Sequence, residues 1–165
     1  MNFRVSAGLV LYRIRNGQLE VFLAHPGGPF FAHKDEGHWT IPKGEIEPEE
    51  EFLATAIREF KEEIGMEIQP QSQFLDLGSI CQKGGKTVQA WGVEGDCDAS
   101  APIQSNEFKM EWPPGSGKFQ SFPEVDRAQF FPMSEARKKI KPTQIPLLER
   151  LEASLKQSKQ LKTTP

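Results

Sequence analysis

The feature that most constrains this chain is the run from Gly44 to Met66, GEIEPEEEFLATAIREFKEEIGM. Its apolar residues recur at helical spacing and fall on one stripe of a helix at about 100° per residue. Pro48 suits a first helical position, and Gly65 supplies the left-handed residue that often ends a helix. The run therefore predicts an amphipathic helix whose apolar stripe faces a core. The stripe consists of Leu53, Ala56, Ile57, Phe60 and Ile64.

The same helix gathers carboxylates at one edge of this stripe. With Leu53 set to zero, Glu62, Glu59 and Glu63 fall at about 180°, 240° and 280° on the helical wheel. Crowded carboxylates repel one another, and partial burial disfavours their charged forms unless a cation compensates. Mg²⁺, or Mn²⁺ in its place, prefers carboxylate and carbonyl oxygens and can share its shell with phosphate. The pattern thus predicts a divalent metal site at this edge.

The alternative interpretation is a solvated acidic face. Between Glu45 and Glu63 the chain carries eight Glu against Arg58 and Lys61, a net charge of −6, whereas the whole chain carries −3. This concentration of negative charge favours the metal site. Arg58 precedes Glu62 by four residues, so we expect it to orient that carboxylate rather than to bind substrate.

The order and spacing of the polar residues and glycines in this run resemble the Nudix box of hydrolases that cleave a nucleoside diphosphate linked to another group. The resemblance implies an α/β fold, namely the Nudix α/β/α sandwich with a central mixed β-sheet. It also implies that Glu59 and Glu63 are metal ligands and that Glu62 is a ligand or holds a metal-bound water. The backbone at Lys43 and Gly44, above all the carbonyl of Lys43, would complete the shell. The residues that carry the resemblance are Gly44, Glu50, Arg58, Glu59, Glu62, Glu63 and Gly65.

The resemblance leaves the general base open, because in this family it comes either from the box or from a later loop. Glu124 lies just before the last predicted strand, where many members of the family carry a functional Glu. Its alternative role is that of a surface carboxylate. We therefore expect the base to be Glu124 or a carboxylate of the box.

A second resemblance precedes the box, in Trp39-Thr40-Ile41-Pro42-Lys43-Gly44. Such a lead-in is similar to that of hydrolases of diadenosine polyphosphates and of diphosphoinositol polyphosphates. It implies a dinucleoside polyphosphate substrate such as diadenosine tetraphosphate. A tyrosine that bacterial enzymes of this kind often carry past the box is absent, since that window holds Gln82-Lys83-Gly84. The alternatives are a nucleoside triphosphate pyrophosphohydrolase, including one for oxidised nucleotides, and a non-catalytic Nudix domain that binds a regulatory nucleotide.

Several residues are candidates for substrate binding. Lys43 is placed to hold an outer phosphate, although a solvated lysine in a turn is the alternative. Trp39 and Trp112 are candidates to stack on a base, and the alternative for each is a core aromatic. Lys83 and Lys86 either face the substrate or occupy an exposed turn.

Composition bounds the partners of the chain. The net charge of −3 and the pI near 5.7 give no general attraction to duplex nucleic acid, so we expect a small-molecule nucleotide partner. We also expect no membrane span and a cytoplasmic protein, because no leader pattern is present and no apolar run reaches about 18 residues. The two cysteines are too few and too isolated to predict a thiolate metal site or a disulfide framework. Nothing in the sequence predicts the oligomeric state.

The remaining segments predict an alternation of strands and helices within one domain, residues 1–165. The segment Gly95–Pro123 is expected to be irregular and functional, because long irregular segments in compact domains usually are. The tail Lys156–Pro165 is expected to fray. The predicted strands are Val5–Ile14, Leu19–Ala24, Phe74–Gln82, Thr87–Val93 and Ala128–Phe131, and the later predicted helices are Ser134–Ile140 and Gln144–Leu161.

Overall fold

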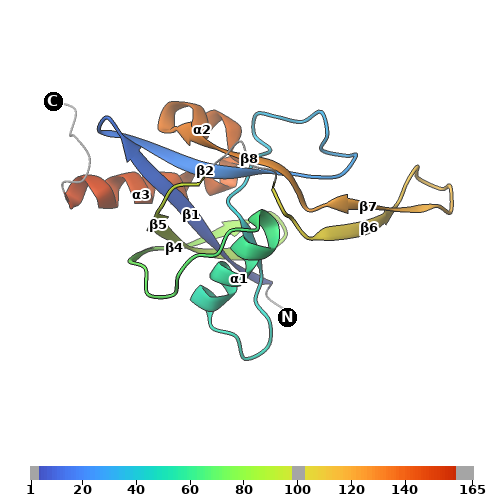
Figure 1. Cartoon of the computed structure of the whole chain (residues 1–165), viewed down its shortest axis with the longest axis horizontal. Coiled ribbons are helices and arrows are strands. Elements are labelled where there is room, and N and C mark those ends of the chain that lie inside the picture. The colour runs from blue at the N-terminus through green and yellow to red at the C-terminus, as the bar shows by residue number, and fades with distance from the viewer. Residues whose placement is uncertain (1–3, 98–102, 159–165) are drawn as a thin grey trace.

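A computed structural model of the chain describes residues 4–97 and 103–158. Its centre is a six-stranded mixed sheet with strand order β4-β5-β1-β2-β8, in which β3 also pairs with β1 (Figure 1). β1 runs parallel to β5, and the other named pairs of this sheet are antiparallel. The strands are β1 (Val5–Arg15), β2 (Gln18–Pro26), β3 (Lys43–Glu45), β4 (Phe74–Gln82), β5 (Lys86–Glu94) and β8 (Val125–Pro132).

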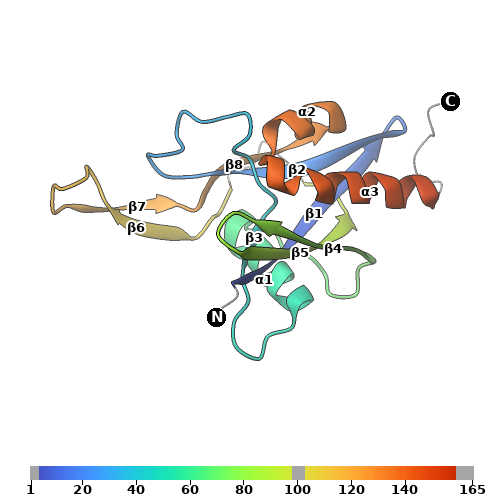
Figure 2. The same cartoon turned by 180° about the vertical axis from the view of Figure 1, so that it is seen from behind.

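Helices cover both faces of the sheet. α1 (Phe52–Ile64) lies on one face, and α2 (Met133–Lys139) and α3 (Ile145–Gln157) lie on the other, as the two opposite views show (Figures 1 and 2). Alternate residues of β1 enter two separate cores: Val10 packs on the α3 side, and Leu9 packs on the α1 side. The predicted α/β/α sandwich is confirmed.

The strands follow the local sequence signals. Asn16 and Gly17 both take a positive φ, of 53° and 76°, which suits the two-residue turn that joins β1 to β2. All five predicted strands are present, with ends shifted by a few residues. Trp39 and Thr40, which lead into the box, form only isolated bridges to Ile140 and Ala24.

The box helix ends where the sequence predicted but begins later. Gly65 takes a φ of 85° and ends α1, whereas the first helical residue is Phe52 rather than Pro48. The carboxylate of Glu50 accepts hydrogen bonds from the backbone N–H of Glu47 (3.3 Å) and from the hydroxyl of Thr55 (2.5 Å). These bonds hold the residues before Phe52 in a turn, so the prediction for Pro48 was wrong.

The expectation of an irregular segment from Gly95 to Pro123 was wrong in part. β6 (Glu107–Glu111) and β7 (Phe119–Pro123) form a two-stranded sheet of their own, which projects from the body as a ribbon (Figure 1). The loop after β2 packs against it, because Phe30 contacts Trp112 edge-on at 5.5 Å. Residues 98–102 of this segment lie outside the described residues.

The C-terminal part contains the two predicted helices. α2 is followed by a short 3-10 helix, η1 (Pro142–Gln144), which leads directly into α3. Lys156 and Gln157 belong to α3, and the rest of the predicted frayed tail beyond residue 158 lies outside the described residues. Among the described residues, no helix is long and apolar enough to cross a membrane.

Candidate active site

α1 places three carboxylates along the edge that faces β3. The side chains of Glu59 and Glu62 are 13% and 36% exposed, and Glu63 is 8% exposed. The predicted position of Glu59 and Glu63 at the border of the core is therefore confirmed. The backbone N–H of Lys43 donates a 2.9 Å hydrogen bond to Oε2 of Glu63, which fixes this carboxylate against β3.

Burial makes these carboxylates reluctant to ionise. It raises the pKa of Glu63 to about 8, against the opposing effects of the Lys43 N–H and the Lys43 charge. Burial also raises the pKa of Glu59, and repulsion from Glu62 adds to this effect. The pKa of Glu124 is raised for the same two reasons. A positive charge placed among these groups would therefore be strongly favoured.

Arg58 binds the carboxylates of Glu59 and Glu62 through hydrogen bonds. Its Nη1 donates to Glu59 at 2.9 Å and to both oxygens of Glu62 at 3.1 Å. Its Nε and Nη2 donate to Glu50 at 2.8 and 3.0 Å, and these bonds, together with the Thr55 hydroxyl, lower the pKa of Glu50 to about 2. The expected contact between Arg58 and Glu62 is present. From its sequence position Glu50 was expected in the motif and in the first turn of the helix; instead it precedes α1 and anchors Arg58.

Gly44 has a structural reason to be glycine. A Cβ at this position would lie 1.9 Å from Cδ of Glu59, so the carboxylate occupies the space that any side chain would fill. Lys43 and Gly44 therefore bring the backbone of β3 into direct contact with the carboxylates of α1. That the backbone at Lys43 and Gly44 completes a metal shell stays a prediction.

These carboxylate oxygens are suitable ligands for a hard divalent cation, although they do not form a complete coordination site in this structure. Among residues 4–97 and 103–158, no three His, Cys, Asp or Glu side chains are grouped closely enough to hold a metal ion as they stand. As the structure stands, Glu59 and Glu62 accept hydrogen bonds from Arg58, whereas Glu63 accepts one from the N–H of Lys43. All of these donors are oxygens whose mutual repulsion a dication would relieve.

Glu124 lies between β7 and β8 and is tied to the end of α1 through the backbone. Its N–H donates to the carbonyl of Asn106 (2.8 Å), and the N–H of Asn106 donates to the carbonyl of Glu62 (2.8 Å). The negative charge of Glu124 also contributes to the raised pKa of Glu59 and of Glu63. The structure thus brings Glu124 to the carboxylates of the box, 61 positions after Glu63 in the sequence. No local sequence signal pointed to Asn106.

The lysines singled out in the sequence lie at the start of β3 and at the turn between β4 and β5. Lys43 is partly buried, and burial lowers its pKa; the charge of Lys141 adds to this effect, while Glu63 opposes it. Lys83 and Lys86 flank the turn between β4 and β5 and line a cavity of about 350 Å³ together with Lys141. No local sequence signal pointed to Lys141.

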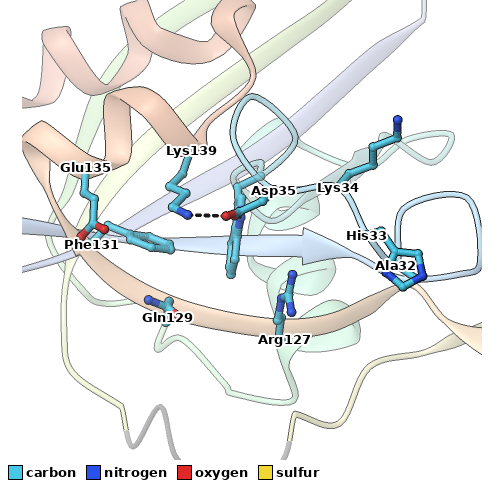
Figure 3. A pocket seen from close by; sticks show the side chains of 10 residues that line it. Ala32, His33, Lys34, Asp35, Arg127, Gln129, Phe131, Glu135 and Lys139 are labelled. Carbon is cyan, nitrogen blue, oxygen red and sulfur yellow. Dashed lines mark hydrogen bonds and ion pairs between the residues drawn. The ribbon is translucent and has the colours of Figure 1, made fainter.

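The structure favours packing over base stacking for Trp39. This residue is 3% exposed, donates from Nε1 to Asp35 at 2.8 Å, and meets Phe131 edge-on at 4.9 Å. It lines a second cavity, where Asp35 pairs with Lys139 and Arg127 reaches in from β8 (Figure 3).

Trp112 lies at the end of the projecting ribbon and is partly exposed, in contact with Phe30. None of its described contacts connects it to the carboxylates, so its expected role in base stacking stays a prediction.

Comparisons with known proteins agree with this geometry. The chain is 35% identical over 83 residues to the bis(5'-nucleosyl)-tetraphosphatase [asymmetrical] of Rattus norvegicus, a match that covers 46% of this chain and 54% of the rat protein. It is 37% identical over 118 residues to the protein of the same name from Sus scrofa, covering 65% and 76% of the two chains. The chain thus spans about half the length of the rat protein and three quarters of the pig protein.

The fold is shared with solved structures. A C. elegans Ap4A hydrolase binary complex superposes with a TM-score of 0.64 and 24% identity over 92% of this chain and 98% of that chain. The family model of the NUDIX domain matches residues 2–151, which include α1, β3 and the carboxylates described above. The chain belongs to the NUDIX family.

Proposed function

We propose that this protein is a metal-dependent pyrophosphohydrolase that acts on dinucleoside polyphosphates, with diadenosine tetraphosphate as its best substrate and ATP and AMP as products. One observation carries the proposal: the backbone N–H of Lys43 donates to the carboxylate of Glu63 at 2.9 Å, and the charge of the Lys43 side chain interacts both with Glu63 and with the lysines Lys86 and Lys141. A metal ion at the carboxylates and the positive charges of these lysines would together bind the negative charges of a long phosphate chain. The names of the rat and pig relatives support the same substrate class.

In this proposal Glu59, Glu62 and Glu63 hold Mg²⁺, with Mn²⁺ as a substitute. The metal, when bound, neutralises phosphate oxygens and lowers the pKa of water. Arg58 keeps Glu59 and Glu62 in place, and the N–H of Lys43 keeps Glu63 in place. The backbone of Lys43 and Gly44 closes the site on the side of β3.

Water attacks one phosphorus atom, the bridging P–O bond breaks, and the leaving phosphate oxygen keeps the electron pair. Glu124 takes the proton of the attacking water, a role that its raised pKa and its place beside Glu62 support. The ammonium group of Lys43 holds a phosphate beyond the reacting one. The complete set of carboxylates favours an enzyme over a module that only binds a nucleotide, because binding alone would not require all of them.

A substrate panel tests this proposal. Purified protein with MgCl₂ is offered diadenosine tetraphosphate, ATP, an oxidised guanine nucleotide and a nucleotide sugar, and products are resolved by anion-exchange chromatography. We expect the highest kcat/KM for diadenosine tetraphosphate. Binding of a nucleotide without turnover of any substrate would instead identify a regulatory domain, and a clearly faster substrate from another class would replace the dinucleotide.

A further inference from the structure

The imidazole of His25, near the end of β2, is fully buried and has an oxygen atom at each ring nitrogen. Its Nε2 donates to the carbonyl of Lys34 at 2.6 Å. Its Nδ1 lies in hydrogen-bond contact with Oδ1 of Asp126, at 2.8 Å. The ring also meets Trp39 edge-on at 5.1 Å. One buried side chain thus joins β2, the loop that follows it and the start of β8.

The contact between His25 and Asp126 occurs at an irregularity in the pairing of β2 with β8. His25 pairs with Arg127, whereas the next residue, Pro26, pairs with Val125, so Asp126 is an additional residue on β8. Bulges of this kind redirect a side chain out of the regular alternation of a strand. Here the carboxylate of Asp126 reaches the buried ring although its side chain is 33% exposed. The bulge lies directly after the segment that carries the proposed general base.

A backbone hydrogen bond holds the same two segments together. The N–H of Gly27 donates to the carbonyl of Glu124 at 2.9 Å. A Cβ at Gly27 would overlap the carbonyl oxygen of Pro123, so this close approach requires glycine. On each segment the backbone bond lies two residues from the contact between His25 and Asp126. We call this bond and the side-chain contact together the β2–β8 clamp.

Electrostatic repulsion acts to move Glu124 away from the carboxylates of the box. Burial raises the pKa of Glu124, and the negative charge of Glu62 adds to this effect. Carboxylates that repel one another separate unless the backbone that carries them is held. A general base must lie within hydrogen-bond reach of the proton that it takes, so a small displacement of Glu124 would slow proton transfer. The β2–β8 clamp opposes this displacement.

We propose that His25 and Asp126 are positioning residues, which hold Glu124 at the carboxylates of the box through the β2–β8 clamp. The inference rests on the proposed function, because it takes Glu124 as the general base. His25 and Asp126 act through the backbone and touch no reacting atom. Loosening the clamp should therefore lower kcat and leave KM almost unchanged, because the metal ion and the lysines, which bind the phosphates, stay in place.

Asp126→Ala tests the clamp at a partly exposed residue, where the fold tolerates the change. We expect kcat for diadenosine tetraphosphate to fall about tenfold or more, with little change in KM. Asp126→Asn should recover part of this loss, because its amide oxygen can still accept a hydrogen bond from the ring. The control is Asp96→Ala, which removes a bond of the same length, 2.8 Å, to Arg13, at the end of β1 opposite to its pairing with β3. A normal kcat in Asp126→Ala, or the same loss in the control, would overturn the proposal.

Two variants of His25 show which of its two contacts positions the base. The amide nitrogen of Asn lies near the position of Nδ1, so His25→Asn can keep the contact with Asp126. The amide nitrogen of Gln lies near the position of Nε2, so His25→Gln can keep the contact with Lys34. Both variants lose the ring that packs on Trp39, so they share the same packing cost. We expect His25→Asn to retain the higher kcat, and equal or reversed values would overturn the role of the Asp126 contact.

Amide hydrogen exchange tests the clamp without any turnover. Exchange of the Gly27 N–H should be about tenfold or more faster in Asp126→Ala than in the wild type. The N–H of Ala24, which donates to the carbonyl of Thr40 at 2.8 Å, is the internal reference and should be unchanged. Equal exchange of Gly27 in both proteins would overturn the proposal while the enzyme assignment stands. If no substrate is hydrolysed but exchange of Gly27 still depends on Asp126, the clamp stands and the proposed function fails.

Discussion

The backbone N–H of Lys43 donates a 2.9 Å hydrogen bond to the carboxylate of Glu63. This bond joins the strand before the box to the most deeply buried carboxylate of the box helix. One residue thus supplies a backbone donor to the carboxylates and, in the proposed function, a side-chain cation to the phosphates, so small shifts of β3 would act on both. Variants of Lys43 and of Glu63 separate these two contributions.

Glu63→Gln should keep the fold and lower turnover by ~10³-fold or more, because it removes charge from the proposed metal shell while preserving shape. Steady-state rates and Mg²⁺ titrations measure the effect. The control is Glu51→Gln, at the exposed start of the same helix, where no side-chain cap hydrogen bond is present. Near-normal turnover of Glu63→Gln, or equal losses in both variants, would contradict the assignment of Glu63 as a ligand.

The free energy of unfolding of the metal-free protein should fall as pH rises from about 5 to 8. The pKa of Glu63 is about 8 when folded and near 4.5 when unfolded, so the folded state keeps a proton that the unfolded state has lost. Stability is therefore greatest below the unfolded pKa and is lost as pH approaches 8, by ~3 kcal/mol. Urea unfolding in EDTA at several pH values tests this. Glu63→Gln should flatten the profile, and an equally steep profile would exclude Glu63 as the cause.

Glu124→Gln tests the general base. If Glu124 takes the proton of the attacking water, turnover should fall by roughly 10²- to 10⁴-fold and the acidic limb of the pH–rate profile should flatten. Metal affinity should stay close to that of the wild type. An unchanged rate and pH–rate profile would mean that the general base is a carboxylate of the box, with Glu59 or Glu62 as the next residue to test.

Glu50→Gln should lower turnover by about 10- to 100-fold, because Glu50 anchors the guanidinium that positions Glu59 and Glu62. The matched control is Glu47→Gln, whose carboxylate is 67% exposed and 3.9 Å from Arg58. Turnover and thermal unfolding are measured together. A loss of stability without a loss of turnover would show that Glu50 serves the helix start alone.

Lys43→Ala should reduce kcat/KM for diadenosine tetraphosphate more than for ATP. A four-phosphate bridge offers more charge to bind than a triphosphate, and remote binding energy can align the reacting phosphorus. The difference should be on the order of 1–2 kcal/mol in transition-state free energy. Parallel assays of the two substrates measure it, and equal losses would mean that Lys43 acts only on the reacting phosphate.

The sequence predicted those parts of the molecule that depend on neighbours along the chain. The apolar stripe of α1, the stop at Gly65 and the main strands follow from periodicity and local turn residues, and they are confirmed. The start of the helix at Phe52 was missed because it depends on a side chain, that of Glu50, which binds Arg58 eight residues further on.

Long-range contacts account for the rest of what was missed. Gln144 accepts a hydrogen bond from the N–H of Ile41, 103 positions earlier in the chain, and the N–H of Lys141 donates to the carbonyl of Trp39. Neither contact has a local sequence signal. The arrangement of the chain as one domain stays a prediction, with the family match to residues 2–151 in its favour.

The two ends of the β6–β7 ribbon differ in their tolerance of insertions. The root, at Glu107 and Pro123, adjoins the central sheet, and the tip, at Glu111 and Phe119, lies at the far end. At the root, the N–H of Gly27 donates to the carbonyl of Glu124, whose own N–H donates to Asn106. At the tip, the N–H of Trp112 donates to the carbonyl of Lys118 and closes a short turn far along the ribbon. Residues 113–117 therefore form a natural insertion point, where a fluorophore or an affinity tag could be carried without altering the register of the central sheet.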